Sequence, residues 1–274
     1  MANNGSSSGV VPAIDTTVPE QQETNPLEML MQQVVEEQGP PQAAEEPAPQ
    51  IDYNKPLEDG ADGYAIYSTP EAAEAAMGLG NGGEADQWAK KLTSNQRDGV
   101  KRYTDGYYSE MNNWMRKLST EISGTNKDRI ASLQHALDKY TLQKPTVTHR
   151  GMGPEILGLK ANASTKQIVA RVKKLMGMDA HITDLGFSSA GAASNKAWSK
   201  KVVIHTQTPA GKGIGAFVAG QSQYHSENEF LYNSGTHFKI LGVYVQNGQV
   251  HINARWDGRD KSTNAGKHIT DTPF

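Results

Sequence analysis

The residues after Thr146 fall into short β-forming runs, and this pattern limits the fold more than any other feature of the sequence. These runs, broken by Gly, Asn and Pro, are residues 147–150, 184–189, 201–206, 215–218, 230–232, 238–245 and 250–254. Helical periodicity precedes them in three segments, residues 85–92, 96–115 and 128–140. Between the first two runs, residues 164–176 have the pattern of an amphipathic helix with Ser164 as its cap. Helices followed by dense short strands predict an α+β fold with an N-terminal helical lobe.

The first sixty residues differ in composition from the rest of the chain. They hold eight of the thirteen prolines and eleven acidic residues against one basic residue, Lys55. Such a polar sequence buries too little apolar surface to offset its ordering entropy, so we expect it to be disordered. A Gly-rich transition follows at residues 78–83. The pattern therefore predicts a disordered, acidic, Pro/Gln/Glu-rich tail over residues 1–83 and one folded domain over residues 84–274.

One segment of this tail has helical character. This segment runs from Asn25 to Glu37. Asn25 can cap a helix, and Pro26 suits the first helical position. The apolar residues of the segment fall near one face, which makes it a candidate docking peptide for a partner. The alternative is a transient helix without a partner, because isolated helices of this length are marginal in water.

Composition excludes several kinds of site. The chain has no cysteine, which rules out disulfides, thiolate nucleophiles and cysteine-ligated zinc. It has no apolar run of the roughly 18 residues that a membrane span needs and no Sec-type signal peptide, so we expect a soluble protein without a membrane partner. After residue 60, 26 basic residues stand against 19 acidic ones. This excess suits an anionic ligand or an acidic partner and serves solubility equally well, and nucleic acid is not indicated.

Three short motifs, about forty residues apart, carry side chains suited to chemistry. Arg150 stands at a strand end beside Gly151, where a guanidinium can hold phosphate oxygens bidentately while bare backbone comes close to a ligand. Ser189 ends the run Gly-Phe-Ser-Ser, and a strand-end serine can orient a carboxylate. Glu227 and Glu229 form an acidic pair that can reach one cleft from a loop leading into a strand. Each motif alone is weak, and their order and spacing carry the interpretation.

In this order the motifs resemble those of the arginine-serine-glutamate class of mono-ADP-ribosyltransferases, which includes bacterial toxins, effectors and tailed-phage enzymes. That family has an aromatic-Arg-Gly strand, a Gly-Phe-x-Ser-Thr-Ser strand and a Glu-x-Glu or Gln-x-Glu at the end of a mobile loop. The resemblance covers roughly residues 85–250. Its flanking matches are residues 102–108 with Asn112, then Ala136, Leu137 and Lys144, and residues 213–240 around the two glutamates.

The resemblance implies a two-sheet β core and an enzyme that moves ADP-ribose from NAD onto an arginine of a protein target, with release of nicotinamide and without a metal. Glu229 would hydrogen-bond the ribose 2′-hydroxyl and stabilise an oxocarbenium-like transition state. Arg150 would grip the phosphate or ribose side of NAD, Gly151 would offer backbone contacts to the nicotinamide amide, and Ser189 would orient Glu229. A glutamate at position 227 accompanies arginine acceptors in the family, because a carboxylate can pair with a guanidinium and help to deprotonate it.

Some residues depart from the family pattern or admit two interpretations. His149 stands where an aromatic residue is common, and only the first hydroxyl of the Ser-Thr-Ser element is present, at Ser189. Tyr224 is a candidate for contacting the protein target, and the alternative is that it packs the loop. Phe187 and Trp198 are expected in the core rather than stacked on a ligand.

Two other functions are compatible with the sequence. One is a virion-structural or interaction protein that keeps the fold, and the intact set of Arg150, Ser189, Glu227 and Glu229 speaks against it. The other is an NAD glycohydrolase, which differs only in using water as the acceptor. The expected setting is delivery into a foreign cytoplasm, as a protein packaged in a phage particle or secreted and injected as an effector. A disordered acidic arm would suit passage through a narrow conduit.

Overall fold

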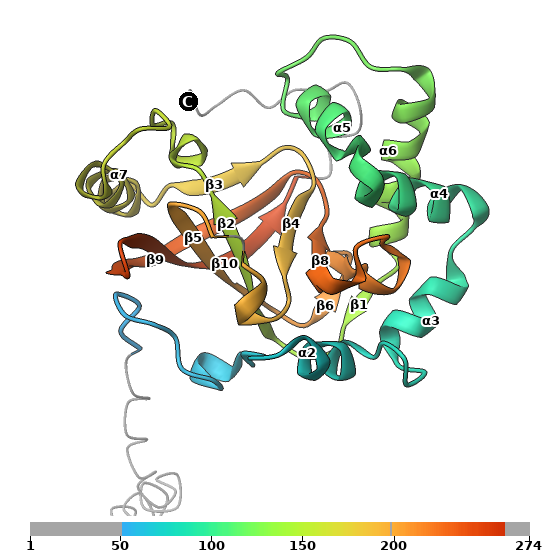
Figure 1. The fold of residues 1–274 in the computed structure, drawn as a ribbon, viewed down its shortest axis with the longest axis horizontal. Coiled ribbons are helices and arrows are strands. Elements are labelled where there is room, and N and C mark those ends of the chain that lie inside the picture. The colour runs from blue at the N-terminus through green and yellow to red at the C-terminus, as the bar shows by residue number, and fades with distance from the viewer. Residues whose placement is uncertain (1–50, 198, 261–274) are drawn as a thin grey trace, which may run out of the picture. The chain divides into compact units, whose positions relative to one another are not determined.

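A computed structural model of the chain describes residues 51–197 and 199–260 (Figure 1). The predicted disorder of residues 1–50, the helical segment at residues 25–37 and the core position of Trp198 all fall outside these described residues. The described part consists of a helical region and a large sheet, which confirms the α+β fold. In this part of the chain no helix is long and apolar enough to span a membrane.

The helices follow the periodicity and the capping residues of the sequence. They are α2 (Pro70–Met77), α3 (Glu84–Lys91), α4 (Ser94–Arg102), α5 (Tyr108–Met115), α6 (Gly124–Leu137) and α7 (Thr165–Gly177). The helices predicted over residues 85–92, 128–140 and 164–176 are confirmed as α3, α6 and α7. Ser164 and Gln167 form a capping box at the start of α7, in which each side chain bonds the backbone N–H of the other residue.

The predicted helix over residues 96–115 is interrupted. Between α4 and α5, η2 (Tyr103–Tyr107) is a π-helical turn in which Asp105 and Gly106 leave helical geometry. Gly106 has a φ of 99°, a conformation that glycine adopts without steric cost. A periodicity of 3.6 residues continues across this turn in the sequence, so it does not reveal the break. Turns of this kind are frequent at functional sites, and this one contributes to the cleft described below.

In the described part, eight strands form a mixed sheet. They are β2 (Thr146–Met152), β3 (His181–Asp184), β4 (Ser188–Gly191), β5 (Val202–Thr208), β7 (Gly215–Phe217), β8 (Glu229–Tyr232), β9 (Thr236–Gln246) and β10 (Gln249–Arg259). Their order is β3-β9-β10-β5-β2-β4-β8-β7, with β10 and β5 parallel and the other neighbours antiparallel. A separate two-stranded sheet pairs β1 (Thr141–Leu142) with β6 (Gly211–Lys212).

The large sheet has two parts that meet at β2 and β4. These two strands pair at His149 and Gly191, whereas β2 pairs with β5 along seven residue pairs from Thr146 to Met152. The predicted two-sheet core therefore takes the form of one hydrogen-bonded sheet with a narrow junction. Arg150 and Ser189 lie on the two strands that meet there.

The strand predicted over residues 184–189 is wrong. Asp184 ends β3, and the chain turns before Ser188 begins β4. The Asp184 carboxylate accepts a hydrogen bond from the Gly186 backbone N–H at 3.0 Å, which stabilises the turn. The apolar residues inside this turn gave it the appearance of a strand, and one of them, Phe187, is fully buried in the core as predicted.

In the structure the compact unit begins at Ile51, so residues 51–83 pack with the domain whose predicted start is residue 84. Residues 51–69, named here the strap, cross the sheet and lead into α2. The Asn253 side-chain amide in β10 donates to the carbonyl oxygens of Tyr53 and Lys55, at 2.8 and 2.9 Å. Further along, Tyr67 pairs with Ala193 as an isolated β-bridge. These contacts are polar or use backbone atoms, so a hydrophobic pattern does not reveal them.

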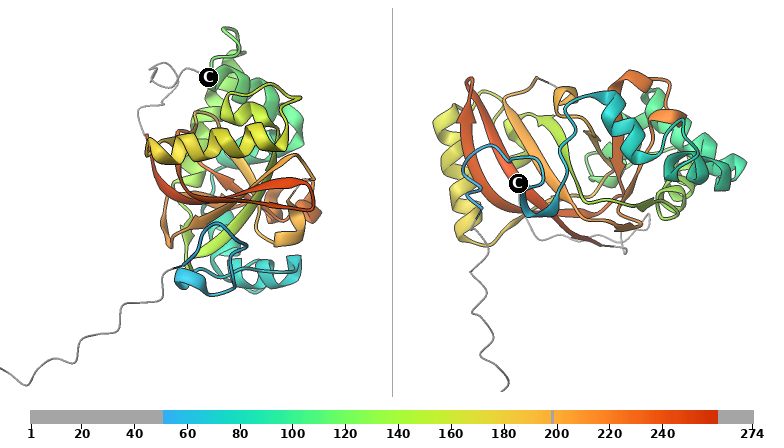
Figure 2. Two further views of the ribbon diagram at one scale, coloured as in Figure 1. Left: turned by 90° about the vertical axis from the view of Figure 1, so that its left-hand side faces the viewer. Right: turned by 90° about the horizontal axis from the view of Figure 1, so that it is seen from below.

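The strap and α7 lie on opposite sides of β9 and β10 (Figure 2). On one side, α7 buries Ile168 and Val172 in the core. On the other side the strap passes close to Gly242 in β9, where a Cβ atom would stand 2.1 Å from the Tyr53 carbonyl oxygen. Glycine is therefore required at this crossing, and the strap covers a face of the sheet that would otherwise be open.

A chain that begins at Glu84 is expected to be much less stable than one that begins at Ile51. The shorter chain loses the strap and α2, whose Ala73 and Met77 are buried, and removal of one buried large side chain alone costs about 2–5 kcal/mol. For a domain of this size that loss alone corresponds to a fall in melting temperature of about 4–20 °C. Thermal unfolding of the two chains followed by circular dichroism measures the difference. Equal melting temperatures would contradict the assignment of residues 51–83 to the fold.

Candidate active site

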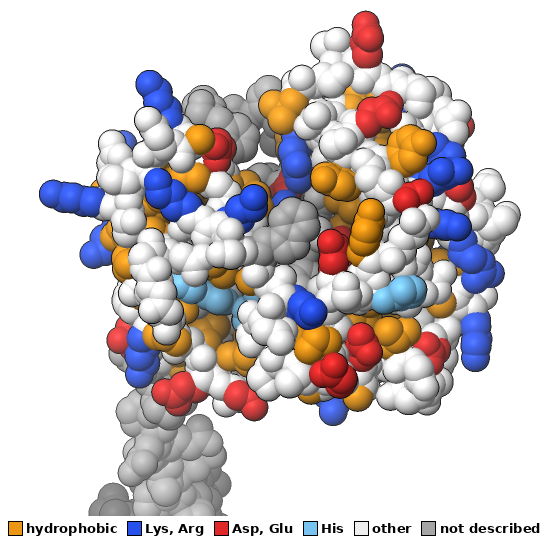
Figure 3. Space-filling view, viewed as in Figure 1, with side chains coloured by type: hydrophobic (Ala, Val, Ile, Leu, Met, Phe, Trp, Pro, Cys, Tyr) orange, Lys and Arg blue, Asp and Glu red, His pale blue; other side chains and the backbone are white. Residues whose placement is uncertain are grey.

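A cleft of about 520 Å³ opens beside the junction of the two parts of the sheet. It is lined by β2, β4 and the start of β8 on the sheet side and by η2 and α5 on the helical side. Its volume falls within the range of about 300–1,000 Å³ that is typical of small-molecule sites. On the face drawn in Figure 3, charged side chains are spread over the surface, and both acidic and basic ones occur near the centre.

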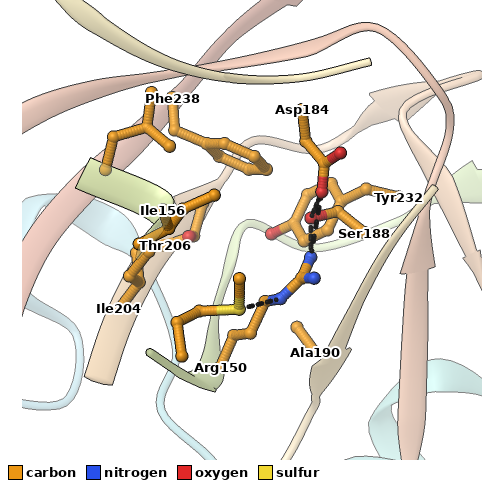
Figure 4. A pocket seen from close by; sticks show the side chains of 11 residues that line it. Arg150, Ile156, Asp184, Ser188, Ala190, Ile204, Thr206, Tyr232 and Phe238 are labelled. Atoms are coloured by element: carbon orange, nitrogen blue, oxygen red, sulfur yellow. Dashed lines mark hydrogen bonds and ion pairs between the residues drawn. The ribbon is translucent and has the colours of Figure 1, made fainter. Parts of the chain in front are cut away.

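Arg150 extends from β2 toward β3 and β4 (Figure 4). Its Nη1 donates to the Asp184 carboxylate at 3.4 Å and to the Ser188 hydroxyl, and its Nε lies 2.8 Å from the Met152 sulfur. Burial lowers the pKa of the guanidinium, and the neighbouring Asp184 carboxylate acts in the opposite direction. Because arginine keeps its proton in proteins, the group is a fixed cation in the wall of the cleft.

Asp184 holds two arginines at once. Besides Arg150, its carboxylate accepts hydrogen bonds from Arg116 Nε and Nη2 at 2.8 and 2.9 Å, and Arg116 reaches it from just beyond α5. Arg116 also lines the cleft. The sequence motifs include neither residue, because Asp184 begins a run with the pattern of a strand and Arg116 lies outside the motifs. The ion pair with Asp184 thus holds Arg116 at the site as a second cation beside Arg150.

Glu229 is the first residue of β8 and is almost completely buried, with 5% of its surface exposed. Its register partner in β4 is Gly191. Burial raises its pKa to about 7, and the Glu227 charge adds to this effect, whereas a hydrogen bond with Ser189 and the charge of Arg150 lower it. Glu229 is therefore a carboxylate that changes charge near neutral pH.

Glu227 lies closer to solvent than Glu229. It ends the short turn η6 (His225–Glu227), is half-buried, and has a pKa that is raised by burial. Tyr224 immediately precedes this turn, and 53% of its surface is exposed. Both residues line the cleft and are more exposed to solvent than Glu229.

The cleft brings together all of the predicted site residues, namely Arg150, Gly151, Ser189, Tyr224, Glu227 and Glu229. Their individual roles stay predictions. The opposite wall carries residues from the stretch that resembled the family's helical region, namely Tyr103, Thr104, Tyr108 and Asn112. Asn112 also joins the helices to the sheet, because its Oδ1 accepts from the Phe187 backbone N–H at 2.8 Å.

His149, which stands where the family commonly has an aromatic residue, hydrogen-bonds a histidine of the neighbouring strand. Its Nδ1 lies 2.8 Å from Nδ1 of His205 in β5, and Nε2 of His205 lies 2.9 Å from Nδ1 of His251 in β10. Burial lowers the pKa of His149 to about 4 and also lowers those of His205 and His251. The two nitrogens of His205 serve different neighbours, so the three rings form a neutral chain rather than a set of ligands around one ion.

No group of three or more His, Asp or Glu side chains with metal-binding geometry occurs among residues 51–197 and 199–260. The expectation that the reaction uses no metal stays a prediction. Within the cleft, the charges come from Arg150, Arg116, Lys196 and Lys200 on the cationic side and from Glu227 and Glu229 on the anionic side. The presence of both signs suits a ligand that carries negative groups and develops positive charge elsewhere in its structure during the reaction.

Residues 81–266 match the sequence profile of a family described as ADP-ribosyltransferase exoenzyme. No curated protein matches the chain.

Several solved structures have a similar fold. BECa, an ADP-ribosylating toxin from a binary enterotoxin of C. perfringens solved with NADH, is 21% identical with a TM-score of 0.60, and the match covers 70% of this chain and 50% of BECa. Plx2a, an ADP-ribosyltransferase toxin from Paenibacillus larvae, is 20% identical with a TM-score of 0.59, and the match covers 74% and 100% of the two chains. C3stau2 from S. aureus, solved with NAD, is 16% identical with a TM-score of 0.58, and the match covers 72% and 99%. The chain thus spans about half of BECa and the whole of the two shorter structures.

Proposed function

Because the chain belongs to the ADP-ribosyltransferase exoenzyme family and is an NAD-dependent transferase, we propose that it transfers ADP-ribose to an arginine side chain of a protein target. The observation that carries this proposal is the presence of two carboxylates, Glu227 and Glu229, in one cleft with Arg150. Their different burial fits two different tasks, one on the bond that breaks and one on the incoming acceptor.

NAD is the donor substrate, and the cleft suits a dinucleotide. Its wall carries Arg150 and Arg116, and a guanidinium is well matched to the oxygens of a pyrophosphate or ribose. Gly151 follows Arg150 in β2 and presents backbone without a side chain, so a planar carboxamide such as that of nicotinamide can approach it closely. We assign NAD binding to Arg150, Gly151, Ser189 and Glu229.

We assign cleavage of the glycosidic bond to Glu229. The bond between the nicotinamide nitrogen and C1′ of the ribose breaks, nicotinamide leaves with the electron pair, and positive charge develops at C1′ and the ring oxygen. A buried carboxylate held by Ser189 stabilises that charge more than a solvated one, and the charge is absent in the ground state. The scheme needs no covalent intermediate with the protein.

We assign acceptor activation to Glu227. An incoming guanidinium nitrogen forms a bond to C1′ and loses a proton, which a nearby carboxylate can accept. Burial raises the pKa of Glu227, so it is a better proton acceptor than a fully solvated glutamate. Tyr224 precedes it on the rim with about half of its surface exposed, which suits contact with the target protein.

Arg150→Ala is expected to weaken NAD binding about 10- to 100-fold, because hydrogen bonds to a charged group each contribute about 1.5–3 kcal/mol. Asp184 keeps its bond to Arg116 in this variant, so the site is not left with an unpaired buried carboxylate. Isothermal titration calorimetry with NAD measures the effect, and Arg97→Ala at an exposed position on α4 is the control. An unchanged NAD affinity in Arg150→Ala would remove Arg150 from the binding site.

We further propose that the protein acts in a foreign cytoplasm, either packaged in a phage particle or injected as an effector. The support is the family of exoenzymes to which it belongs and the fold that it shares with ADP-ribosylating toxins.

The test of the proposed function is incubation of the protein with isotope-labelled NAD and a cell lysate, followed by mass spectrometric mapping of the modified residue. ADP-ribose attached to arginine is the expected result. Label attached to another residue type would overturn the arginine assignment, and release of free ADP-ribose without any modified protein would identify a glycohydrolase.

A further inference from the structure

The turn between the two glutamates of the site has an unusual backbone conformation. Asn228, which separates Glu227 from Glu229, has φ 55° and ψ 45°, in the left-handed region. A non-glycine residue pays a steric cost there, although asparagine tolerates it better than most. Asn228 is also completely buried. A strained, buried residue between two site carboxylates needs contacts that hold it in place.

Those contacts come from α2. The Asn228 Nδ2 donates to the Pro70 carbonyl oxygen at 3.3 Å and to Glu74 Oε1 at 3.4 Å, both on the first turns of α2. The Asn228 carbonyl oxygen accepts from the Ala192 backbone N–H at 2.9 Å. The strap lies behind this second contact, because the Ser194 N–H donates to the Tyr67 carbonyl oxygen at 2.8 Å.

The same segment of the chain also contacts the loop that leads into the glutamates. The side chain of Leu79, just after α2, lies so close to Gly220 that a Cβ at Gly220 would stand 2.6 Å from Leu79 Cδ1. The loop from residue 218 to residue 228 is therefore held near its start by Leu79 and at its end by α2.

Glu229 has supports of its own that do not involve α2. It pairs with Gly191 in the sheet, its carbonyl oxygen accepts from the Val218 N–H at 2.9 Å, and Ser189 hydrogen-bonds its carboxylate. A change in the backbone angles of Asn228 would therefore move Glu227 and leave Glu229 in place. Misplacement of a reacting group by about 1 Å can reduce a rate about 100-fold.

We propose that α2, through Asn228, is a positioning element that sets the location of Glu227 relative to Glu229. Asn228 and Glu74 are then positioning residues that determine how much of the cleaved ADP-ribose reaches the acceptor rather than water. This inference rests on the proposed function, in which Glu227 serves the acceptor and Glu229 serves bond cleavage.

The main test is Asn228→Gly, which keeps the left-handed conformation accessible and removes both side-chain hydrogen bonds. The ratio of protein modification to nicotinamide release in water is expected to fall at least about tenfold, because Glu227 loses its fixed position. NAD affinity by calorimetry and nicotinamide release are expected to stay near the wild-type values. Such a divided effect would not follow from a general loss of stability, which lowers both activities together.

Three further variants separate positioning from folding. Glu74→Ala removes one acceptor from Asn228 and is expected to lower the ratio about three- to tenfold, the contribution of one hydrogen bond. Glu74→Gln keeps an acceptor oxygen and is expected to restore the ratio. Glu71→Gln, at an exposed position on the same helix, is the matched control. If Asn228→Gly does not fold, the two Glu74 variants decide the question by the same ratio.

The ratio is measured with whichever acceptor the wild type modifies, so that the two proposals fail separately. An active wild type with an unchanged ratio in Asn228→Gly and Glu74→Ala would overturn the positioning role alone. A wild type that modifies a residue other than arginine would overturn the acceptor assignment alone. A wild type that releases nicotinamide and modifies no protein would overturn both.

Discussion

Glu229→Gln is expected to abolish both nicotinamide release and protein modification while making the substrate-free protein more stable at pH 8. Loss of one preorganised electrostatic contact in a transition state costs about 100- to 1,000-fold in rate, so activity should fall at least that far. The gain in stability arises because glutamine has no charge to desolvate, whereas the pKa of Glu229 is raised to about 7 by burial.

The direction of the pH effect follows from that pKa. In the unfolded chain Glu229 has the usual glutamate pKa of 4.5, whereas in the folded protein its pKa is about 7. Between these pH values the folded protein therefore keeps a proton that the unfolded chain has lost. The stabilisation that comes from this retained proton is complete below pH 4.5 and is lost as the pH rises through about 7. A shift of this size corresponds to about 3 kcal/mol, or a difference in melting temperature of about 6–12 °C for a domain of this size.

Melting temperatures of wild type and Glu229→Gln at pH 4 and pH 8 provide the measurement. The two proteins should melt alike at pH 4 and differ at pH 8, and Glu121→Gln at an exposed position should match wild type at both. For wild type, kcat/KM for nicotinamide release should rise with pH up to about 7 and then level off, because the charged carboxylate is the active form. A Glu229→Gln protein that is less stable than wild type at pH 8 would contradict the account of burial.

Much of the site could be predicted from the sequence because its chemistry is carried by short motifs. Arg150 and Gly151 are adjacent along β2, and Glu227 and Glu229 are two residues apart, so local sequence describes each group. Strands and the helix α7 followed from periodicity and from the cap at Ser164, since both reflect burial of one face. The sequence alone does not give the strand register that brings Ser189 close to Glu229. That proximity was expected only because of the resemblance to a family.

The missed residues act through long-range polar contacts. Asp184 binds Arg116 across 68 residues, and Asn228 binds Pro70 across 158 residues. Neither contact has a periodic or compositional signature. The composition of the strap predicts disorder, because it is as polar as that of the residues before it, although its carbonyl groups accept hydrogen bonds from Asn253. The composition of a segment indicates whether it has enough apolar residues to form a core of its own. A segment that packs on an existing sheet needs few such residues.

Glu227→Gln is expected to separate acceptor activation from bond cleavage. Glutamine keeps the shape of the side chain and its hydrogen-bonding oxygen but has no charge to pair with a guanidinium and cannot take its proton. Glu229 is untouched, and its pKa should fall slightly, because the Glu227 charge is one of the influences that raise it. Nicotinamide release into water should therefore persist within about threefold, while arginine modification should fall about 100-fold or more.

Two parallel assays on wild type and Glu227→Gln measure the separation. One follows nicotinamide release without a protein acceptor, and the other follows incorporation of ADP-ribose into an acceptor that contains arginine. Glu227 lies nearer to solvent than Glu229, so the acceptor can reach it without displacing the buried carboxylate, and this geometry underlies the expected difference. An equal loss of both activities would mean that Glu227 acts on NAD itself. Undiminished arginine modification would mean that another group receives the guanidinium, and the acceptor side of the proposed function would then have to be assigned to a different part of the rim.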